Sequence, residues 1–255
     1  MLLVIDVGNT NIVFGLFDGP DFKGTFRLMT ETPRTADEIG VMLIDHFTHI
    51  GLKLSDVSDV VISSVVPQVM YTVTHAITKY VEKSPLIVDE HIEHELVNLA
   101  EEPLGADRVM GLIGAREKYG APLILLDFGT ATKADALNDR GEYMGGLICP
   151  GIKISMDALF LKAARLPRIE IRKPDRCIGV NTVGQMQAGA VYGYVGSVEY
   201  IVANMKREMG YDRIPVIATG GLSSIISEYT AVIDTIDRAL VMNGLRIVYE
   251  KNKGV

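Results

Sequence analysis

The sequence predicts an α/β protein built from two copies of one unit, each with a mixed sheet flanked by helices. Two observations lead to this fold class. The N-terminal line "MLLVIDVGNTNIVFGLFDG" recurs in similar form 121 residues later as "PLILLDFGTATKADALNDRG". Three strand-like apolar runs at the start of the chain are followed by helical and strand patterns in alternation, which is typical of an α/β unit.

The repeat consists of an apolar strand, an aspartate, a glycine, small polar residues and a second apolar strand. A gapless alignment pairs Asp6 with Asp127 and Leu16 with Leu137. The second copy starts just after a helical pattern that glycine and proline end at 120–122. We therefore expect two domains, at 1–118 and 119–255.

The other elements follow from apolar periodicity and from capping signals. Thr35 and Glu38 have capping-box spacing at the start of a helix, and Pro67 precedes the next helical pattern. Besides the second Asp-Gly strand pair, the expected strands are 2–7, 12–17, 24–30, 59–66, 85–89 and 214–221. The expected helices include 35–52, 68–81, 105–120, 152–163, 182–209 and 234–251.

The composition is that of a globular protein, with 48% hydrophobic and 22% charged residues. Lys+Arg 25 against Asp+Glu 32 gives a net charge of −7, which disfavours nucleic acid and anionic membranes as partners. Cys149 and Cys177 have neither disulfide-framework nor metal-site spacing. Neither a signal-peptide pattern nor an uncharged apolar run of ~20 residues is found, so we expect a cytoplasmic protein.

The repeated Asp-x-Gly turn has the chemistry of a phosphate-binding turn. Such a turn exposes consecutive backbone N–H groups, an aspartate at the strand end can hold a cation, and Thr10, Thr130 and Thr132 can add hydroxyl donors. A single copy is better explained as an ordinary hairpin turn. Two copies in register reverse that preference and favour a polyphosphate ligand held by both turns.

Two further motifs leave alternatives open. In "GADR", Asp107 and Arg108 are either a base and an anion clamp for a hydroxyl substrate that carries a carboxylate, or residues that favour a helix start. The glycines of "ATGG" at 218–221 allow either the close approach of a ligand or simply a turn.

Two clusters are better explained by structure than by chemistry. The histidines and glutamates of "EHIEHE" at 90–95 fit a solvated loop or helix start better than a metal site. Small residues on the long helix suit close packing, in a core or at a subunit contact: Gly189, Gly193 and Ser197.

Taken together, the motifs resemble those of one family. "DVGNTN", "GADR", "DFGTAT", "GGLICPGI", "NT" at 181–182 and "ATGG" occur in the order typical of type III pantothenate kinases, the family of the Bvg accessory factor relatives. That family belongs to the acetate and sugar kinase, Hsp70 and actin superfamily. The resemblance implies two duplicated ribonuclease-H-like domains that clamp ATP between them, with one acidic turn from each domain.

The resemblance also implies a reaction, the ATP-dependent phosphorylation of the 4′-hydroxyl of pantothenate, which is the first step of coenzyme A biosynthesis. Asp107 would be the proton acceptor and Arg108 would bind the substrate carboxylate, while Thr182 would reach pantothenate from the neighbouring subunit of a homodimer. Asp6 would hold magnesium, directly or through water, and Asp127 a monovalent cation, K⁺ or NH₄⁺. The implied ATP-binding residues are Asp6, Val7, Gly8, Asn9, Thr10, Asn11, Ile12, Val13 and Thr130. The implied substrate-binding residues are Gly105, Ala106, Asp107, Arg108 and Thr182.

Three positions depart from the family pattern. Asn98 stands nine residues before Asp107, where a tyrosine usually helps to close over pantothenate, and the neighbouring proline is displaced to Pro103. Lys133 replaces a threonine; it either supplies cation charge near the phosphates or points to solvent, and we favour solvent. Ala134 stands where a larger apolar residue is common.

Two other functions remain open. The substrate-side departures leave room for a kinase of the same superfamily that acts on another small hydroxyl substrate. A nucleotide-binding regulator without turnover is the alternative of another class. The retained acidic residues and Arg108 disfavour it, because a pure binder does not need a base beside the γ-phosphate.

Overall fold

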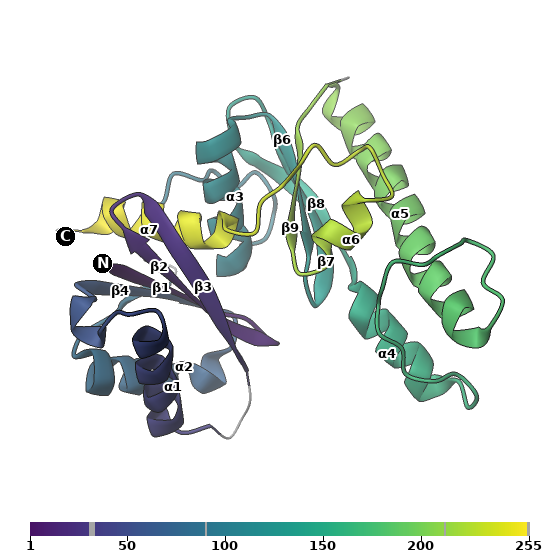
Figure 1. Ribbon diagram of the computed structural model, residues 1–255. Coiled ribbons are helices and arrows are strands. Elements are labelled where there is room, and N and C mark those ends of the chain that lie inside the picture. Colours follow the sequence, from purple (N-terminus) through teal and green to yellow (C-terminus); the bar gives the residue numbers. More distant parts are fainter. Residues whose placement is uncertain (31–33, 90, 212, 254–255) are drawn as a thin grey trace. The chain divides into compact units, whose positions relative to one another are not determined.

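The computed structural model describes residues 1–30, 34–89, 91–211 and 213–253, and these form two compact units (Figure 1). The first unit comprises Met1–Glu95, Leu104–Gly114 and Leu240–Val255. The second unit comprises Leu96–Pro103 and Ala115–Ala239.

The first unit contains a five-stranded mixed sheet with the strand order β3-β2-β1-β4-β5. Strands β1, β2 and β3 form an antiparallel meander, and β4 and β5 run parallel to β1. The strands are β1 (Leu2–Val7), β2 (Asn11–Asp18), β3 (Asp21–Met29), β4 (Asp59–Ser64) and β5 (Leu86–Val88).

Helices lie on both faces of the first sheet (Figure 1). On one face, α1 (Ala36–His49) and α2 (Pro67–Ala76) bury a core that includes Leu3, Phe14 and Leu43. A π-helical segment, Ile77–Val81, continues α2. On the other face, α7 (Leu240–Asn252) contacts β1 and β4. Contact between α7 and α3 (Ala106–Tyr119) depends on glycines, because a Cβ on Gly114 or Gly244 would overlap backbone atoms of the facing helix.

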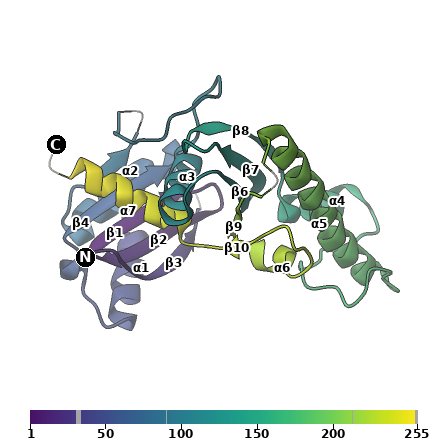
Figure 2. The same cartoon turned by 90° about the horizontal axis from the view of Figure 1, so that it is seen from above.

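The second unit repeats this sheet, with the strand order β10-β9-β6-β7-β8. Its strands are β6 (Leu123–Phe128), β7 (Ala131–Leu137), β8 (Tyr143–Pro150), β9 (Val216–Gly220) and β10 (Thr235–Ile236). One face packs against α4 (Ile152–Lys162), α5 (Thr182–Met209) and α6 (Ser223–Ser227), with a core that includes Ile124, Leu126 and Val191 (Figure 2). The predicted fold class is confirmed: each unit is a mixed five-stranded sheet flanked by helices.

The two sheets correspond strand by strand. Asp6 and Asp127 are each the fifth of six residues in their strands, and β1 and β6 have the same pattern of burial. The connection from β1 to β2 has three residues, whereas the connection from β6 to β7 has two. Strand pairing therefore matches Leu137 with Phe17, because these residues face Leu123 and Leu2. The gapless alignment is right up to the turn and wrong by one residue beyond it.

The C-terminal segment differs from expectation in where it packs. We expected the second domain to run from 119 to 255, but α7 belongs to the first unit. The reason is burial: Leu240, Leu245 and Val248 are fully enclosed on the sheet face that α1 and α2 leave uncovered. Residues 96–103 and 115–118 likewise belong to the second unit rather than the first.

The start of the last helix also differs from expectation. The segment from 234 was expected to be helical throughout, but Thr235 and Ile236 pair with β9 as a short strand. Asp237 then forms a turn before the helix. Its carboxylate accepts the Ala239 N–H at 2.9 Å and pairs with the Lys118 ammonium at 2.5 Å. The helix begins only at Leu240.

Several predicted helix ends are confirmed. Thr35 and Glu38 form the capping box of α1, and α5 spans Thr182–Met209 as predicted. Gly120 and Gly210 follow the last residues of α3 and α5 with φ of 76° and 77°, a conformation that favours glycine. Among the described residues, no helix combines the length and the apolar character that crossing a membrane requires.

Candidate functional site

The first acidic turn comprises residues 6–13. Asp6 lies near the end of β1, on the sheet face opposite the core formed with α1 and α2. Ser63 of the parallel strand β4 is in register with Asp6 and fully buried, and its hydroxyl donates a hydrogen bond to Asp6 Oδ1 at 2.9 Å. This bond orients the carboxylate at the end of the strand.

Backbone hydrogen bonds hold the same turn in one conformation. The N–H of Gly8 donates to the Asn11 carbonyl at 3.0 Å. Thr30, directly after β3, donates its hydroxyl to the Gly8 carbonyl at 2.7 Å and its N–H to the Thr10 carbonyl at 3.0 Å. Asn9 and Thr10 are exposed. The turn is thus a fixed, polar and exposed segment, which suits a phosphate ligand.

The "GADR" motif lies beside this turn, at the start of α3. Val65 follows β4 and donates its N–H to the Val7 carbonyl at 3.0 Å. A Cβ on Gly105 would lie 3.9 Å from Val65 Cγ1 and 2.9 Å from Asp107 Oδ1. The Asp107 carboxylate therefore lies against Gly105, and any larger residue there would displace it. The structure brings the first acidic turn and the "GADR" motif to the same edge of the first sheet.

Asp107 also has the environment of a helix start. It lies in the first turn of α3, where the helix dipole favours a carboxylate. The Gly105 carbonyl accepts the N–H groups of Arg108 and Val109 at 3.0 and 3.1 Å. Asp107 and Arg108 are half-buried. The helix-start interpretation and the chemical interpretation are compatible, because the first explains how the carboxylate is held in place.

The second acidic turn comprises residues 127–133. Asp127 is in register with Thr219 of the parallel strand β9 and lies opposite Lys133 of the antiparallel strand β7. The Lys133 ammonium contacts Asp127 Oδ2 at 3.3 Å. Only 16% of the Lys133 side chain and 30% of the Asp127 side chain are exposed. The expectation that Lys133 points to solvent is wrong, because the strand register directs it onto the aspartate.

Closely packed glycines shape the backbone around the second turn. The N–H of Gly151 donates to the Thr130 carbonyl at 3.0 Å, and a Cβ on Gly151 would overlap that same oxygen. Gly220 has a φ of +89°, and a Cβ there would lie 2.6 Å from the Phe128 carbonyl carbon. This conformation of Gly220 is consistent with the turn interpretation of "ATGG". For Gly221 a Cβ would meet no atom within 4 Å.

The threonines of the second turn differ from each other. Thr130 is exposed, as a phosphate donor has to be. Thr132 is only 4% exposed, and its Oγ1 has no hydrogen-bond partner within the part of the chain that the structure describes. In the strand alternation it shares its face with Ala134, which belongs to the core under α4 and α5. The expectation that Thr132 presents a hydroxyl at the turn surface is wrong.

Two residues at these turns were given no role in the sequence analysis, although Gly151 lies within the quoted "GGLICPGI". The Ser63 hydroxyl donates a hydrogen bond to the Asp6 carboxylate, and the Gly151 N–H donates one to the Thr130 carbonyl. A pair of serines inside the apolar run "DVVISSVV" was a signal for Ser63, because buried hydroxyls in a strand require partners. The position of Gly151 next to the turn depends on the pairing of β7 with β8, which the motif "GGLICPGI" does not show by itself.

Asn98 stabilises its own loop. Its side-chain NH₂ donates to the Glu102 carbonyl at 2.8 Å, and its side-chain oxygen accepts the Ala100 N–H at 2.9 Å. The backbone on either side of it pairs with the edge of β8, where the Tyr143 N–H donates to the Val97 carbonyl at 2.8 Å. Asn98 thus closes a tight loop at the edge of the sheet. This role differs from that of the family's tyrosine, which the resemblance places against the substrate.

Thr182 is the first residue of α5 and is exposed. Asn181 caps the helix, because its side chain accepts the Gly184 N–H at 2.8 Å. Thr182 therefore lies at a helix start on the flank of the second unit, and not at a strand end as Asp127 does.

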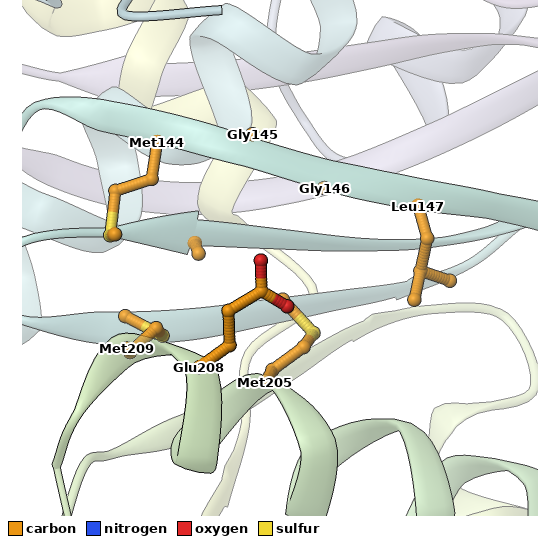
Figure 3. Close-up of a pocket in the computed structure, with 8 residues that line it drawn as sticks. Met144, Gly145, Gly146, Leu147, Met205, Glu208 and Met209 are labelled. Carbon is orange, nitrogen blue, oxygen red and sulfur yellow. The ribbon is translucent and has the colours of Figure 1, made fainter.

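Two other regions, the segment 91–95 and a hollow beside β8, contain none of the predicted catalytic or binding residues. The segment 91–95 packs on α7, where Glu95 pairs with Lys251, and the described residues contain no cluster of three His, Cys, Asp or Glu side chains able to hold a metal ion. An open hollow of about 320 Å³ lies between β8 and the C-terminal half of α5 (Figure 3). It is lined mainly by methionines and leucine, with the Glu208 carboxylate as its charged group. Its apolar lining does not suit a polyphosphate.

Known proteins share the fold of this chain. The chain is similar to a solved structure described as a conserved putative Baf family transcriptional activator from Campylobacter jejuni, with 16% identity, a TM-score of 0.61, and 99% of this chain and 100% of that chain covered. A putative 2-dehydro-3-deoxygalactonokinase from Sinorhizobium meliloti gives 12% identity, a TM-score of 0.60, and 100% and 98% coverage. An activator of 2-hydroxyisocaproyl-CoA dehydratase from Clostridium difficile, with bound ADPNP, gives 13% identity, a TM-score of 0.50, and 100% and 97% coverage.

At these identities the three structures establish the fold alone. The family model for type III pantothenate kinase matches residues 2–204, which is most of the chain and includes both acidic turns, the "GADR" motif and the start of α5. The chain is a phosphotransferase and belongs to the type III pantothenate kinase family.

Proposed function

We propose that this chain transfers the γ-phosphoryl group of ATP to the 4′-hydroxyl of pantothenate, giving 4′-phosphopantothenate and ADP. The observation that carries the proposal is the position of Asp107. Its carboxylate lies against Gly105, at the edge of the sheet where β1 leads into the first acidic turn. A substrate hydroxyl bound there would lie close both to Asp107, which can accept its proton, and to the first acidic turn, which suits the phosphates.

Asp107 and Arg108 divide the work on the substrate. Asp107 accepts the proton of the attacking hydroxyl, and Arg108, the next residue of the same helical turn, binds the substrate carboxylate. Gly105 and Ala106 line the approach to both side chains. Because phosphoryl transfer depends mainly on alignment and charge neutralisation, fixing both groups on one rigid helix start is an effective arrangement.

As a kinase of this family the chain uses ATP and a divalent metal. Mg²⁺ is usually bound through one or two carboxylates together with waters and substrate phosphates, and Asp6, oriented by Ser63, fits that requirement. When bound, the ion neutralises charge on the phosphates. The proposed nucleotide-binding residues are Asp6, Val7, Gly8, Asn9, Thr10, Asn11, Ile12, Val13 and Thr130.

The monovalent cation that the resemblance places at Asp127 does not fit this chain in the same way. The Asp127 carboxylate already holds the Lys133 ammonium at 3.3 Å. No step of the proposed reaction is therefore assigned to K⁺ or NH₄⁺.

We also propose that the working unit is a homodimer in which Thr182 reaches the substrate of the partner subunit. The segment before α5 exposes apolar side chains, with Ile178 83% and Val180 75% exposed. On α5 itself, a Cβ on Gly189 or Gly193 would meet no atom within 4 Å, so that this helix face is open to close packing. An isologous contact over these residues would create two equivalent shared sites.

A second candidate is a kinase of the same superfamily that phosphorylates another small hydroxyl compound. The observation that favours it is Asn98, whose side chain is bound within its own loop instead of extending as a tyrosine would. This candidate keeps the roles of the acidic turns and of Asp107 and changes only the groups that surround the acceptor.

The two candidates are distinguished by measuring ADP formation from ATP and Mg²⁺ with pantothenate, with sugars and with no acceptor, all in the presence of KCl. The proposal predicts pantothenate-dependent turnover and 4′-phosphopantothenate as product. Turnover with another hydroxyl compound alone would support the second candidate. ATP binding without turnover on any acceptor would instead support the non-catalytic regulator.

A further inference from the structure

Strand pairing fixes the position of Lys133. β6 and β7 are antiparallel, and their register places residue 133 directly opposite residue 127, so both side chains project from the same face of the sheet. The ammonium lies 3.3 Å from Asp127 Oδ2, and both side chains are mostly buried. A lysine at this position is brought to the aspartate by the backbone itself.

In the first unit, the position equivalent to Lys133 is the residue opposite Asp6. There the residue opposite Asp6 is Val13, and the partner strand supplies a hydroxyl, Ser63, just as β9 supplies Thr219 next to Asp127. The two turns agree in strand register and in the hydroxyl neighbour. They differ in the cross-strand residue, which is apolar in the first turn and cationic in the second.

We propose that Lys133 is a built-in cation: its ammonium group takes the place of a monovalent cation at Asp127, so that nucleotide binding and turnover do not require K⁺ or NH₄⁺. This inference rests on the proposed function, because it assumes that the second acidic turn contacts the nucleotide phosphates. It assigns Lys133 a positioning and charge-neutralising role in this chain.

Three physical arguments support the inference. An ammonium group carries the same single charge as K⁺, and its covalent tether makes its presence beside the carboxylate independent of the K⁺ concentration. A second cation bound to the same carboxylate would lie close to the ammonium and be repelled, and this repulsion is weakly screened where the groups are mostly buried. The chain has no GxxxxGK[ST] lysine and carries a net charge of −7, so a positive charge at the second turn has a clear use beside a polyphosphate.

The experiment compares KCl with tetramethylammonium chloride at equal ionic strength, since the larger ion cannot replace K⁺ at a carboxylate. The affinity for a non-hydrolysable ATP analogue and the melting temperature are measured without pantothenate, so that the result does not depend on the acceptor. Wild-type protein is expected to show less than ~2-fold difference in affinity between the salts and no shift in melting temperature on adding K⁺.

Two variants separate charge from packing. Lys133→Thr removes the ammonium and leaves space for an ion, so affinity in tetramethylammonium is expected to fall by ~10-fold or more and to recover in KCl. Lys133→Met fills the same space without charge, and its loss is expected not to recover. Lys23→Thr is the matched control: Lys23 also faces carboxylates, at 3.8 and 3.9 Å, but 44% of its side chain is exposed.

The wild-type measurement needs no variant to fold. A wild-type protein that loses ~10-fold or more of its affinity when KCl is replaced would overturn the inference, as would a Lys133→Thr protein with full affinity in both salts. If pantothenate is not the acceptor, these binding measurements still give their answer. Failure of the proposed reaction and failure of this inference are therefore distinguishable.

Discussion

The first and second acidic turns are two versions of one structure. Both follow a strand with the same burial pattern, and both place an aspartate in register with a hydroxyl residue of the neighbouring parallel strand. They differ in length by one residue and in the residue across the hairpin, Val13 or Lys133. Duplication thus supplied the scaffold, and single residues at equivalent positions give each turn its own electrostatic character.

The turns also differ in how they are supported. After β3, Thr30 holds the first turn through its hydroxyl and its N–H. The equivalent residue after β8 is Gly151, which keeps the N–H bond, to the Thr130 carbonyl, but packs so closely that no side chain fits. A substitution at Thr30 can remove a hydrogen bond from the first turn. A substitution at Gly151 would place a side chain where the Thr130 carbonyl lies in the second. Different substitutions will therefore damage each of them.

The largest effect is expected at Asp107, which belongs to the first turn's surroundings and has no counterpart assigned at the second. Asp107→Asn keeps the size of the side chain but cannot accept the hydroxyl proton, so turnover should fall by ~10²–10⁴-fold. Affinity for an ATP analogue should stay near that of the wild type, as equilibrium titration can check. Turnover close to the wild-type value would mean that Asp107 only starts the helix.

The next effect is expected at Ser63. Ser63→Ala removes the hydrogen bond that orients Asp6, and the Mg²⁺ concentration for half-maximal activity should rise by ~10-fold or more, as is usual for groups that orient a metal ligand. Thr219→Val in the second unit is the matched variant and should leave the Mg²⁺ requirement unchanged. Equal effects of the two substitutions on the Mg²⁺ requirement would contradict the assignment of Mg²⁺ to the first turn.

Smaller effects are expected from the supporting residues. Gly151→Ala forces a Cβ into the Thr130 carbonyl and should lower the free energy of unfolding by ~1–3 kcal/mol, whereas Thr30→Ala should cost ~1 kcal/mol for one hydrogen bond. Urea denaturation of both variants measures the difference. If Gly151→Ala proves neutral, the second turn is not held by close packing.

Much of the fold followed from the sequence, because apolar periodicity and capping signals act locally. The bounds of α5 and the capping box of α1 are examples. The missed features depend on pairing between distant strands. The one-residue difference in turn length shifts every later match in the hairpin, and the short strand at Thr235 exists only because β9 lies beside it. The packing of α7 on the first sheet also depends on a face that other elements leave uncovered.

The same limit applies to the site. The aspartates and "GADR" were visible because their spacing and order are local properties of the chain. The orientation of Lys133 was not, because β7 is buried on both faces over most of its length and its residues do not alternate clearly between apolar and polar. Only the register with β6 shows that this side chain meets Asp127.

We propose that both acidic turns bind one nucleotide. Amide hydrogen exchange with and without a non-hydrolysable ATP analogue and Mg²⁺ tests it most directly, with the binding stoichiometry measured in parallel. We expect one bound analogue per chain and slower exchange at both turns, over residues 8–11 and 129–131. One bound analogue that slows exchange at a single turn, or two independent sites per chain, would contradict it.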